Sequence, residues 1–219
     1  LSFFNINIYK YFYLIQYNFM TDVIGVILAG GKSSRLNGVS KPFISIGSET
    51  LIDRAIKKAR PQVDELILSV NDELFDQLNY GLPRVRDEIF KSVGPLGGIY
   101  SSLDWVSREI PYAKNIIFFT VDVPFFPDDM ADKLLEKKNE KNENNLFCLS
   151  HRGKIQPLFS LWDVSLKDTL LKHLKNKNYK VRSFFNKVSY EVVEIIDSNK
   201  LIFFNVNTFS DLEKLKKLL

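Results

Sequence analysis

The sequence predicts an α/β domain of three layers, in which a mostly parallel sheet carries helices on both faces. Apolar runs of strand length alternate with segments of helical period from Val23 onward, which is the pattern of such a fold. Two of the runs, Val23–Leu28 and Asn115–Val121, are apolar almost throughout, as expected of strands buried on both faces. The chain has 219 residues, 45% of them hydrophobic and 26% charged, which fits one globular domain.

The remaining strands are predicted from further apolar runs of strand length, most of which alternate with helical segments. In chain order, the expected strands are Val23–Leu28, Glu65–Val70, Pro83–Val85, Asn115–Val121, Leu146–Ser150, Lys154–Trp162, Tyr190–Ile196 and Leu201–Val206.

Helices are predicted where apolar residues recur on one helical stripe. Pro61 stops the first helix, Pro95 opens the second, and a Ser-x-x-Glu capping box at Ser210 and Glu213 begins the last. A Lys/Asn/Glu tract that ends near Asn145 is expected to be a solvated loop. The expected helices are Thr50–Ala59, Leu96–Val106, Asp128–Lys138, Ser165–Lys175 and a C-terminal helix from near Ser210.

Residues 1–19 do not resemble a targeting or membrane segment. Polar residues and Lys10 interrupt the apolar stretch, and it has neither a basic start nor a small-residue cleavage site. Met20 directly precedes the first strand. We therefore expect 1–19 to be a non-native or disordered N-terminal extension and 20–219 to form the folded domain. A genuine extension that acts as a weak interfacial segment is the alternative.

Composition excludes several classes of site. One cysteine, Cys148, rules out an internal disulfide framework and a cysteine-cluster metal site, and two histidines rule out a His-rich one. The net charge of +4 and the pI near 9.0 fit a protein that handles anionic small molecules. This basicity is too weak to indicate nucleic acid, and no membrane partner is expected either.

A glycine-rich loop follows the first strand. It is not a P-loop, because Val26 stands where the first P-loop glycine is needed, and the Rossmann Gly-x-Gly-x-x-Gly pattern is absent too. The two adjacent glycines, Gly30 and Gly31, can still bring backbone N–H groups close to a phosphate, and Arg35 can bind phosphate oxygens bidentately. An ordinary strand-to-helix turn is the alternative.

Two further side chains suit chemistry on polyanions. Lys41, six residues after Arg35, can neutralise a triphosphate or its leaving group. Asp122 follows the apolar run NIIFFTV and should emerge at the carboxyl end of that strand, where Mg²⁺ can bind one carboxylate together with substrate phosphates. A turn-forming role before Pro124 is the alternative for Asp122. Asp87 could likewise be an ordinary loop acid, and Asn71 an ordinary turn residue.

The run LAGGKSSRLNGVSKPF resembles the LAGGxSxRMG…K signature of the MobA-like nucleotidyltransferases, and the resemblance extends over nearly all of 23–215. Asn71, after the second strand, resembles the family's nucleoside-contacting asparagine, and Asp87 stands where the family carries an aspartate. The further motifs that resemble the family's are Gly94-Pro95-Leu96-Gly97-Gly98, Thr120-Val121-Asp122-Val123-Pro124-Phe125, Gln156-Pro157-Leu158-Phe159 and Asn205-Val206-Asn207-Thr208. The seven motifs in this order are specific to molybdenum cofactor guanylyltransferases and their close relatives.

The resemblance implies a single Rossmann-like domain of the nucleotide-diphospho-sugar transferase type. It also implies an enzyme of the cytoplasm that uses Mg²⁺ to transfer GMP from GTP to molybdenum–molybdopterin, forming the guanine dinucleotide cofactor and pyrophosphate. Cofactor-delivering and acceptor molybdoenzymes become candidate partners. The implied site residues are Arg35, Lys41 and Asp122 as catalytic residues, Leu28, Ala29, Gly30, Lys41, Asn71, Asp87 and Asp122 as nucleotide-binding residues, and Asp122 as metal ligand.

The chain departs from the family signature beside the lysine. Ser40 replaces the usual aspartate, Leu36 replaces methionine, and the glycine is delayed to Gly38. The loss of the acid favours one alternative, a binding protein without catalytic activity. The sequence also offers little to fix the base, so a cytidylyltransferase acting on the same cofactor and a relative acting on another small phosphate acceptor are further alternatives.

Overall fold

The computed structural model describes residues 23–30, 35–36, 39–91 and 93–219. The predicted N-terminal extension, 1–19, lies outside these residues and stays a prediction. Within the described part of the chain, no helix is long and apolar enough to cross a membrane.

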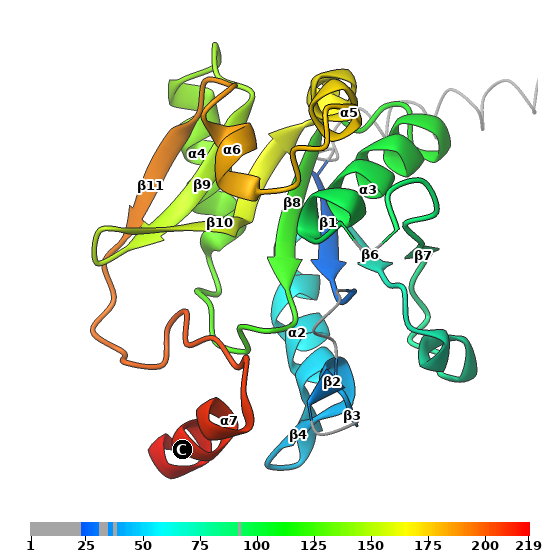
Figure 1. Ribbon diagram of the computed structural model, residues 1–219. Coiled ribbons are helices and arrows are strands. Elements are labelled where there is room, and N and C mark those ends of the chain that lie inside the picture. The colour runs from blue at the N-terminus through cyan, green and yellow to red at the C-terminus, as the bar shows by residue number, and fades with distance from the viewer. Residues whose placement is uncertain (1–22, 31–34, 37–38, 92) are drawn as a thin grey trace, which may run out of the picture.

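A seven-stranded sheet forms the centre of the molecule (Figure 1), with the strand order β11-β9-β10-β8-β1-β6-β7. β1, β6, β7 and β8 run parallel to one another, and β1 lies between β6 and β8. The strands of this sheet are β1 Val23–Leu28, β6 Glu65–Ser69, β7 Arg84–Val85, β8 Asn115–Thr120, β9 Leu146–His151, β10 Lys154–Asp163 and β11 Glu191–Ile195.

β10 is the exception to the parallel arrangement. It pairs antiparallel with both β8 and β9, and its register with β9 shifts between Gln156 and Ser160. β11 then returns parallel to β9. Two short hairpins lie beside the main sheet, one of β2 (Arg35–Leu36) with β3 (Val39–Ser40), the other of β4 (Ser45–Ile46) with β5 (Glu49–Thr50).

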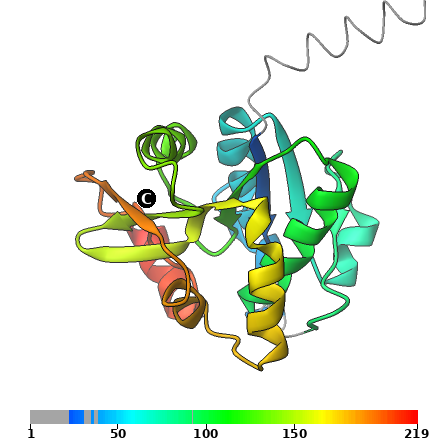
Figure 2. The same ribbon diagram turned by 90° about the horizontal axis from the view of Figure 1, so that it is seen from above.

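Helices cover both faces of the sheet, so the three-layer prediction is confirmed (Figure 2). α2, α4 and α7 contribute to one apolar core, and α3, α5 and α6 to a second core on the opposite face. The α-helices are α2 Leu51–Ala59, α3 Pro95–Glu109, α4 Met130–Glu140, α5 Lys167–Lys175, α6 Val181–Phe185 and α7 Phe209–Leu218. The 3₁₀ helices are η1 Lys41–Phe43, η2 Arg60–Gln62, η3 Glu73–Gln77 and η4 Val164–Leu166.

The structure corrects two details near the C-terminus. The predicted strand Leu201–Val206 is instead a turn over 200–203 followed by irregular backbone. Within the turn, Phe203 has a φ of 59°, and its N–H bonds to the carbonyl of Phe125 at 2.8 Å. The aromatic side chains of this segment pack against the core without joining the sheet. The predicted cap at Ser210 is also wrong, because Thr208 caps α7 through a box with Asp211. The short helix α6 was not predicted.

Candidate functional site

The candidate site residues lie around the carboxyl end of β1. β6 and β8 flank this strand and run parallel to it, so the residues after all three strands meet at one edge of the sheet. They form two groups there. The lysine cluster consists of Lys41, Asp122 and Asn207, and the glycine pocket is lined by Leu28, Gly30, Ser69, Asn71, Asp87, Gly94, Pro95 and Gly98.

The lysine cluster has a buried ammonium group at its centre. Lys41 begins η1 and is only 3% exposed. Its Nζ donates to Asp122 Oδ2 at 3.1 Å and to Asn207 Oδ1 at 3.2 Å. A buried charge is tolerated only when it is paired and hydrogen-bonded, so these two oxygens hold the ammonium group in place. The structure thus brings together Lys41 and Asp122, which lie 81 residues apart in sequence.

Asn207 reaches the cluster because the C-terminal segment is attached beside Asp122. The N–H of Val206 bonds to the Asp122 carbonyl at 2.8 Å, which places the next residue over the lysine. Asn207 was not among the predicted site residues. The signal that could have identified it was the Asn-Val-Asn-Thr motif that contains it.

Asp122 has the properties of a ligand for a hard cation. Its side chain is 33% exposed at the end of β8, and within the described residues only Oδ2 takes a hydrogen bond. No group of three or more His, Cys, Asp or Glu side chains in the described ranges could hold a metal by itself. One carboxylate oxygen open to a cation fits Mg²⁺, which keeps several waters and takes further oxygen ligands from substrate phosphates.

The glycine pocket brings the end of β1 against Asn71. The N–H of Ala29 bonds to the Ser69 carbonyl at 2.9 Å, which keeps the loop next to β6. A Cβ atom on Gly30 would lie 3.1 Å from Asn71 Nδ2 and 3.3 Å from its backbone nitrogen. Glycine is therefore the residue that allows the two backbones to approach this closely.

Asp87 stabilises the glycine pocket through its hydrogen bonds. It is 4% exposed, and its Oδ1 accepts from the Phe90 N–H at 2.9 Å and from Ser101 Oγ at 3.3 Å. The backbone N–H of Asp87 donates to Asn71 Oδ1 at 3.0 Å. This bond orients the side-chain amide of Asn71, so that Nδ2 points away from the Asp87 backbone. Burial raises the pKa of the Asp87 carboxyl. Ser101 and Phe90 were not predicted, since neither forms a motif in sequence.

The start of α3 forms part of the pocket wall. Gly94 caps the helix with a φ of 95° and has no side chain with which to accept from the first backbone N–H groups. Pro95 occupies the first turn, and both residues line the pocket with Gly98. Pro95 has no N–H and the Gly97 N–H bonds to the Gly94 carbonyl at 3.1 Å, so it is the helix dipole that makes this end favourable for an anion or an electronegative group.

Arg35 lies next to the lysine cluster through its backbone, because β2 and β3 pair Arg35 with Ser40. The structure does not describe the Arg35 side chain or residues 31–34, so the predicted phosphate contact of Arg35 stays a prediction.

A model of the MobA-like NTP transferase domain matches residues 25–192. The chain belongs to this family. A relative from Mesorhizobium japonicum named molybdenum cofactor guanylyltransferase is 31% identical over 202 residues, which cover 90% of this chain and 96% of the relative. A relative of the same name from Bradyrhizobium is 32% identical, with 90% and 93% coverage.

Solved structures give the same fold. Molybdopterin-guanine dinucleotide biosynthesis protein A from Archaeoglobus fulgidus superposes with a TM-score of 0.70 at 20% identity, covering 90% of this chain and 97% of that one. Rv0371C from Mycobacterium tuberculosis, solved as a complex with manganese, gives a TM-score of 0.63 at 14% identity, covering 90% and 99%. These identities support the likeness of fold alone.

For this member of the MobA-like NTP transferase family, we predict that Gly30→Val weakens nucleotide binding. The added side chain would press on Asn71 at the contacts described above, and overpacking of this kind costs about 1–3 kcal/mol. Calorimetric titration with GTP should show at least about a tenfold loss of affinity. Unchanged GTP affinity in a folded Gly30→Val protein would place the nucleoside elsewhere.

Proposed function

We propose that this protein transfers GMP from GTP to the phosphate of molybdenum–molybdopterin, forming the guanine dinucleotide cofactor and releasing pyrophosphate. The observation that carries the proposal is the pair of the buried Lys41 with the partly exposed Asp122 beside the glycine pocket. The names of the relatives that align over 90% of the chain support the choice of substrates.

The glycine pocket and the lysine cluster have different roles in the proposed reaction. Leu28, Ala29, Gly30, Asn71 and Asp87 form the wall against which the nucleoside lies. Lys41 and Asp122 stand beyond the end of β1, where the triphosphate would follow. The reaction needs two polyanions held in line and negative charge neutralised as it moves to the leaving pyrophosphate. Lys41 supplies a fixed positive charge for this purpose, and we assign a similar role to Arg35.

Mg²⁺ is the proposed metal, and Asp122 would hold it. When bound, the ion neutralises charge on the triphosphate and orients it. The acceptor phosphate monoester is anionic near neutral pH, so the protein need not supply a strong base. The cytoplasm is the proposed compartment.

The proposal is tested by incubating the purified protein with molybdenum–molybdopterin, Mg²⁺ and each of GTP, CTP, ATP and UTP, and by measuring pyrophosphate release. We expect release with GTP and formation of the guanine dinucleotide. Release with CTP alone would identify a cytidylyltransferase. Activity with another phosphate acceptor but not with molybdopterin would identify a different MobA-like transferase.

Ser40 favours a second candidate, a protein that binds the cofactor without catalysis. The residue is 3% exposed, and its Oγ has no hydrogen-bond partner among the residues that the structure describes. The family's usual aspartate is missing at position 40, but the adjacent Lys41 still has a carboxylate partner in Asp122. The Lys41 ammonium group is therefore paired even without that aspartate.

We therefore predict that Ser40→Asp changes kcat/KM by no more than about tenfold, which corresponds to about 1.4 kcal/mol. Ser40→Ala is the matched control, since it removes the hydroxyl without adding a charge. Steady-state pyrophosphate release measures both variants. A gain of several hundredfold in Ser40→Asp would mean that the natural protein is catalytically impaired and would favour the binding role.

A further inference from the structure

The positive charge of this protein is concentrated in one helical hairpin. Between Thr169 and Tyr190 the sequence holds six Lys and Arg residues and no Asp or Glu. The rest of the chain holds 24 basic and 26 acidic residues, so this segment accounts for the whole excess. We call its six cations the basic hairpin: Lys172, Lys175, Lys177, Lys180, Arg182 and Lys187.

All six side chains are exposed, and within the described residues none forms a salt bridge. Many cations elsewhere are paired: Arg84 and Arg86 with Asp76, and Arg108 with Asp104. In the folded chain, acidic side chains therefore pair with many of the surface cations but not with those of the basic hairpin. Because repulsion among like charges costs stability, binding of an external anion to this cluster would be favourable.

The hairpin displays these charges on a fixed scaffold. His173 Nε2 lies 3.1 Å from Ser183 Oγ and so links α5 to α6, and burial lowers the pKa of the imidazole. The Phe184 ring stacks on Trp162 with centroids 5.1 Å apart and an interplanar angle of 7°. Because both helices are anchored in the core, a partner need not order them on binding.

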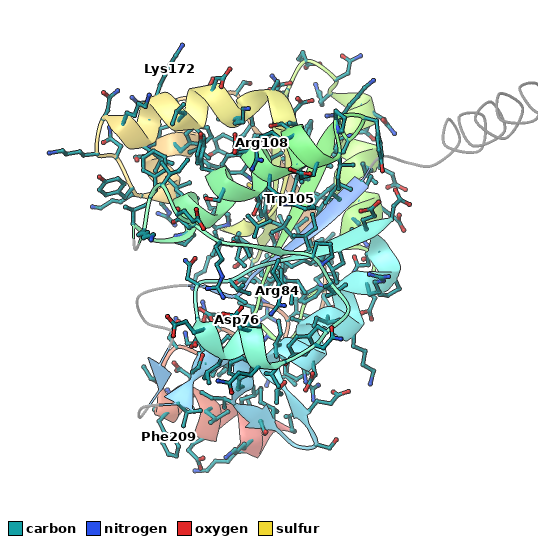
Figure 3. All side chains as sticks on the ribbon, turned by 90° about the vertical axis from the view of Figure 1, so that its right-hand side faces the viewer. Asp76, Arg84, Trp105, Arg108, Lys172 and Phe209 are labelled. Atoms are coloured by element: carbon teal, nitrogen blue, oxygen red, sulfur yellow. The ribbon has the colours of Figure 1, made fainter. Side chains whose placement is uncertain are left out.

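The hairpin lies far from the lysine cluster. β1 and β8 point toward β2 and α7, whereas α5 lies at the opposite end of the molecule (Figure 1). In Figure 3, Lys172 projects into solvent at the end opposite Phe209 of α7. The charges are therefore not part of the triphosphate site, and a macromolecule bound to them would leave that site open.

We propose that the basic hairpin is the docking surface for an acidic protein, one that presents a run of Asp and Glu side chains. Five of the six cations are lysines, strongly hydrated point charges that speed encounter between proteins more than they strengthen a tight contact. Nucleic-acid grooves combine such charges with several stacking aromatics, and membrane-binding surfaces expose apolar side chains. On residues 167–187 the one exposed large hydrophobic side chain is Tyr179, 39% exposed.

The test uses charge reversal at matched positions. K172E/K175E/K180E changes the hairpin, and K114E/K141E/K217E changes three exposed lysines elsewhere that are also absent from the salt bridges. Both variants shift the formal net charge from +4 to −2. Fluorescence anisotropy measures binding of a labelled poly-glutamate peptide, with poly-glutamine as the neutral probe.

We expect the natural protein to bind poly-glutamate and not poly-glutamine, with affinity that falls steeply as salt rises. The hairpin variant should lose at least about tenfold in affinity, and the control variant should stay within about threefold. If the reversed hairpin does not fold, K172Q/K175Q/K180Q replaces it, with a smaller loss expected. Equal pyrophosphate release by all proteins would show that the fold and the transfer site are intact, independently of the docking result.

Three results would overturn the proposal. The natural protein could fail to bind poly-glutamate. The two variants could lose affinity equally, which would leave net charge as the sole cause. Oligothymidine or phosphatidylglycerol vesicles could bind more tightly than poly-glutamate and lose binding in the hairpin variant, which would assign the surface to nucleic acid or to a membrane.

Discussion

Asp122→Asn should lower turnover by about a hundredfold or more, which corresponds to about 3 kcal/mol of transition-state stabilisation. The substitution keeps the size of the side chain and one acceptor oxygen. It removes the charge that pairs with the Lys41 ammonium at 3.1 Å and that, in the proposed reaction, would attract Mg²⁺. The fold should survive, because the side chain is 33% exposed at the end of a strand. Single-turnover pyrophosphate release at several Mg²⁺ concentrations measures the effect.

Asp128→Asn is the matched control for this variant. Asp128 lies six residues further along the same loop and pairs with Lys58 at the surface, where its side chain is 83% exposed. Its loss should leave turnover unchanged. A folded Asp122→Asn protein with normal activity and normal Mg²⁺ dependence would move the metal site elsewhere, with Asp87 as the next carboxylate to test. If the variant unfolds, Asp122 serves the fold, either as a turn-forming residue or as the partner that keeps the buried Lys41 ammonium paired.

Gly97→Ala should damage the glycine pocket through a single methyl group. A Cβ atom at this position would lie 2.1 Å from Asp87 Oδ2 and 2.9 Å from the Phe90 carbonyl oxygen, so the buried carboxylate or the backbone must move. Asp87 in turn orients Asn71 through its N–H. We expect a loss of about 1–3 kcal/mol in the free energy of unfolding. GTP affinity should fall by about tenfold or more.

Ser107→Ala tests whether the effect is local to the pocket. Ser107 lies further along the same helix, and its Oγ bonds to the Asp104 carbonyl at 2.8 Å. This variant should keep its GTP affinity in calorimetry, whatever its melting temperature. Full GTP affinity in Gly97→Ala would mean that the Asp87 loop moves without disturbing Asn71, and that Asp87 has no part in nucleotide binding.

Much of the fold could be predicted because buried strands and helix faces require apolar residues at characteristic spacings in the sequence. β1 and β8 are buried along almost their whole length, and their apolar runs identified them. The same reasoning was wrong at Leu201–Val206, since aromatic side chains can enter a core from turns as well as from strands. β2 to β5, each of two residues, are too short for any periodicity to show.

The candidate site was predictable to the extent that its residues follow strands. Lys41 and Asp122 were identified from their chemistry and position, and the structure brings them together. Asn207 lies 166 residues from Lys41 in sequence, and only the folded chain shows that its side-chain oxygen faces the ammonium group. Ser101 likewise belongs to a helix whose sequence gives no sign that one hydroxyl supports a loop acid.

The hydrogen bond from Val206 to the Asp122 carbonyl determines when, during synthesis of the chain, the lysine cluster can be completed. A ribosome adds Asn207 long after β1, β6, β8 and α3 have been made, although a single domain folds as a unit. A growing chain should thus be unable to immobilise Lys41 until this last segment has been added. Arrested chains that end before Val206 should release no pyrophosphate, and release should begin only once Asn207 has left the ribosome.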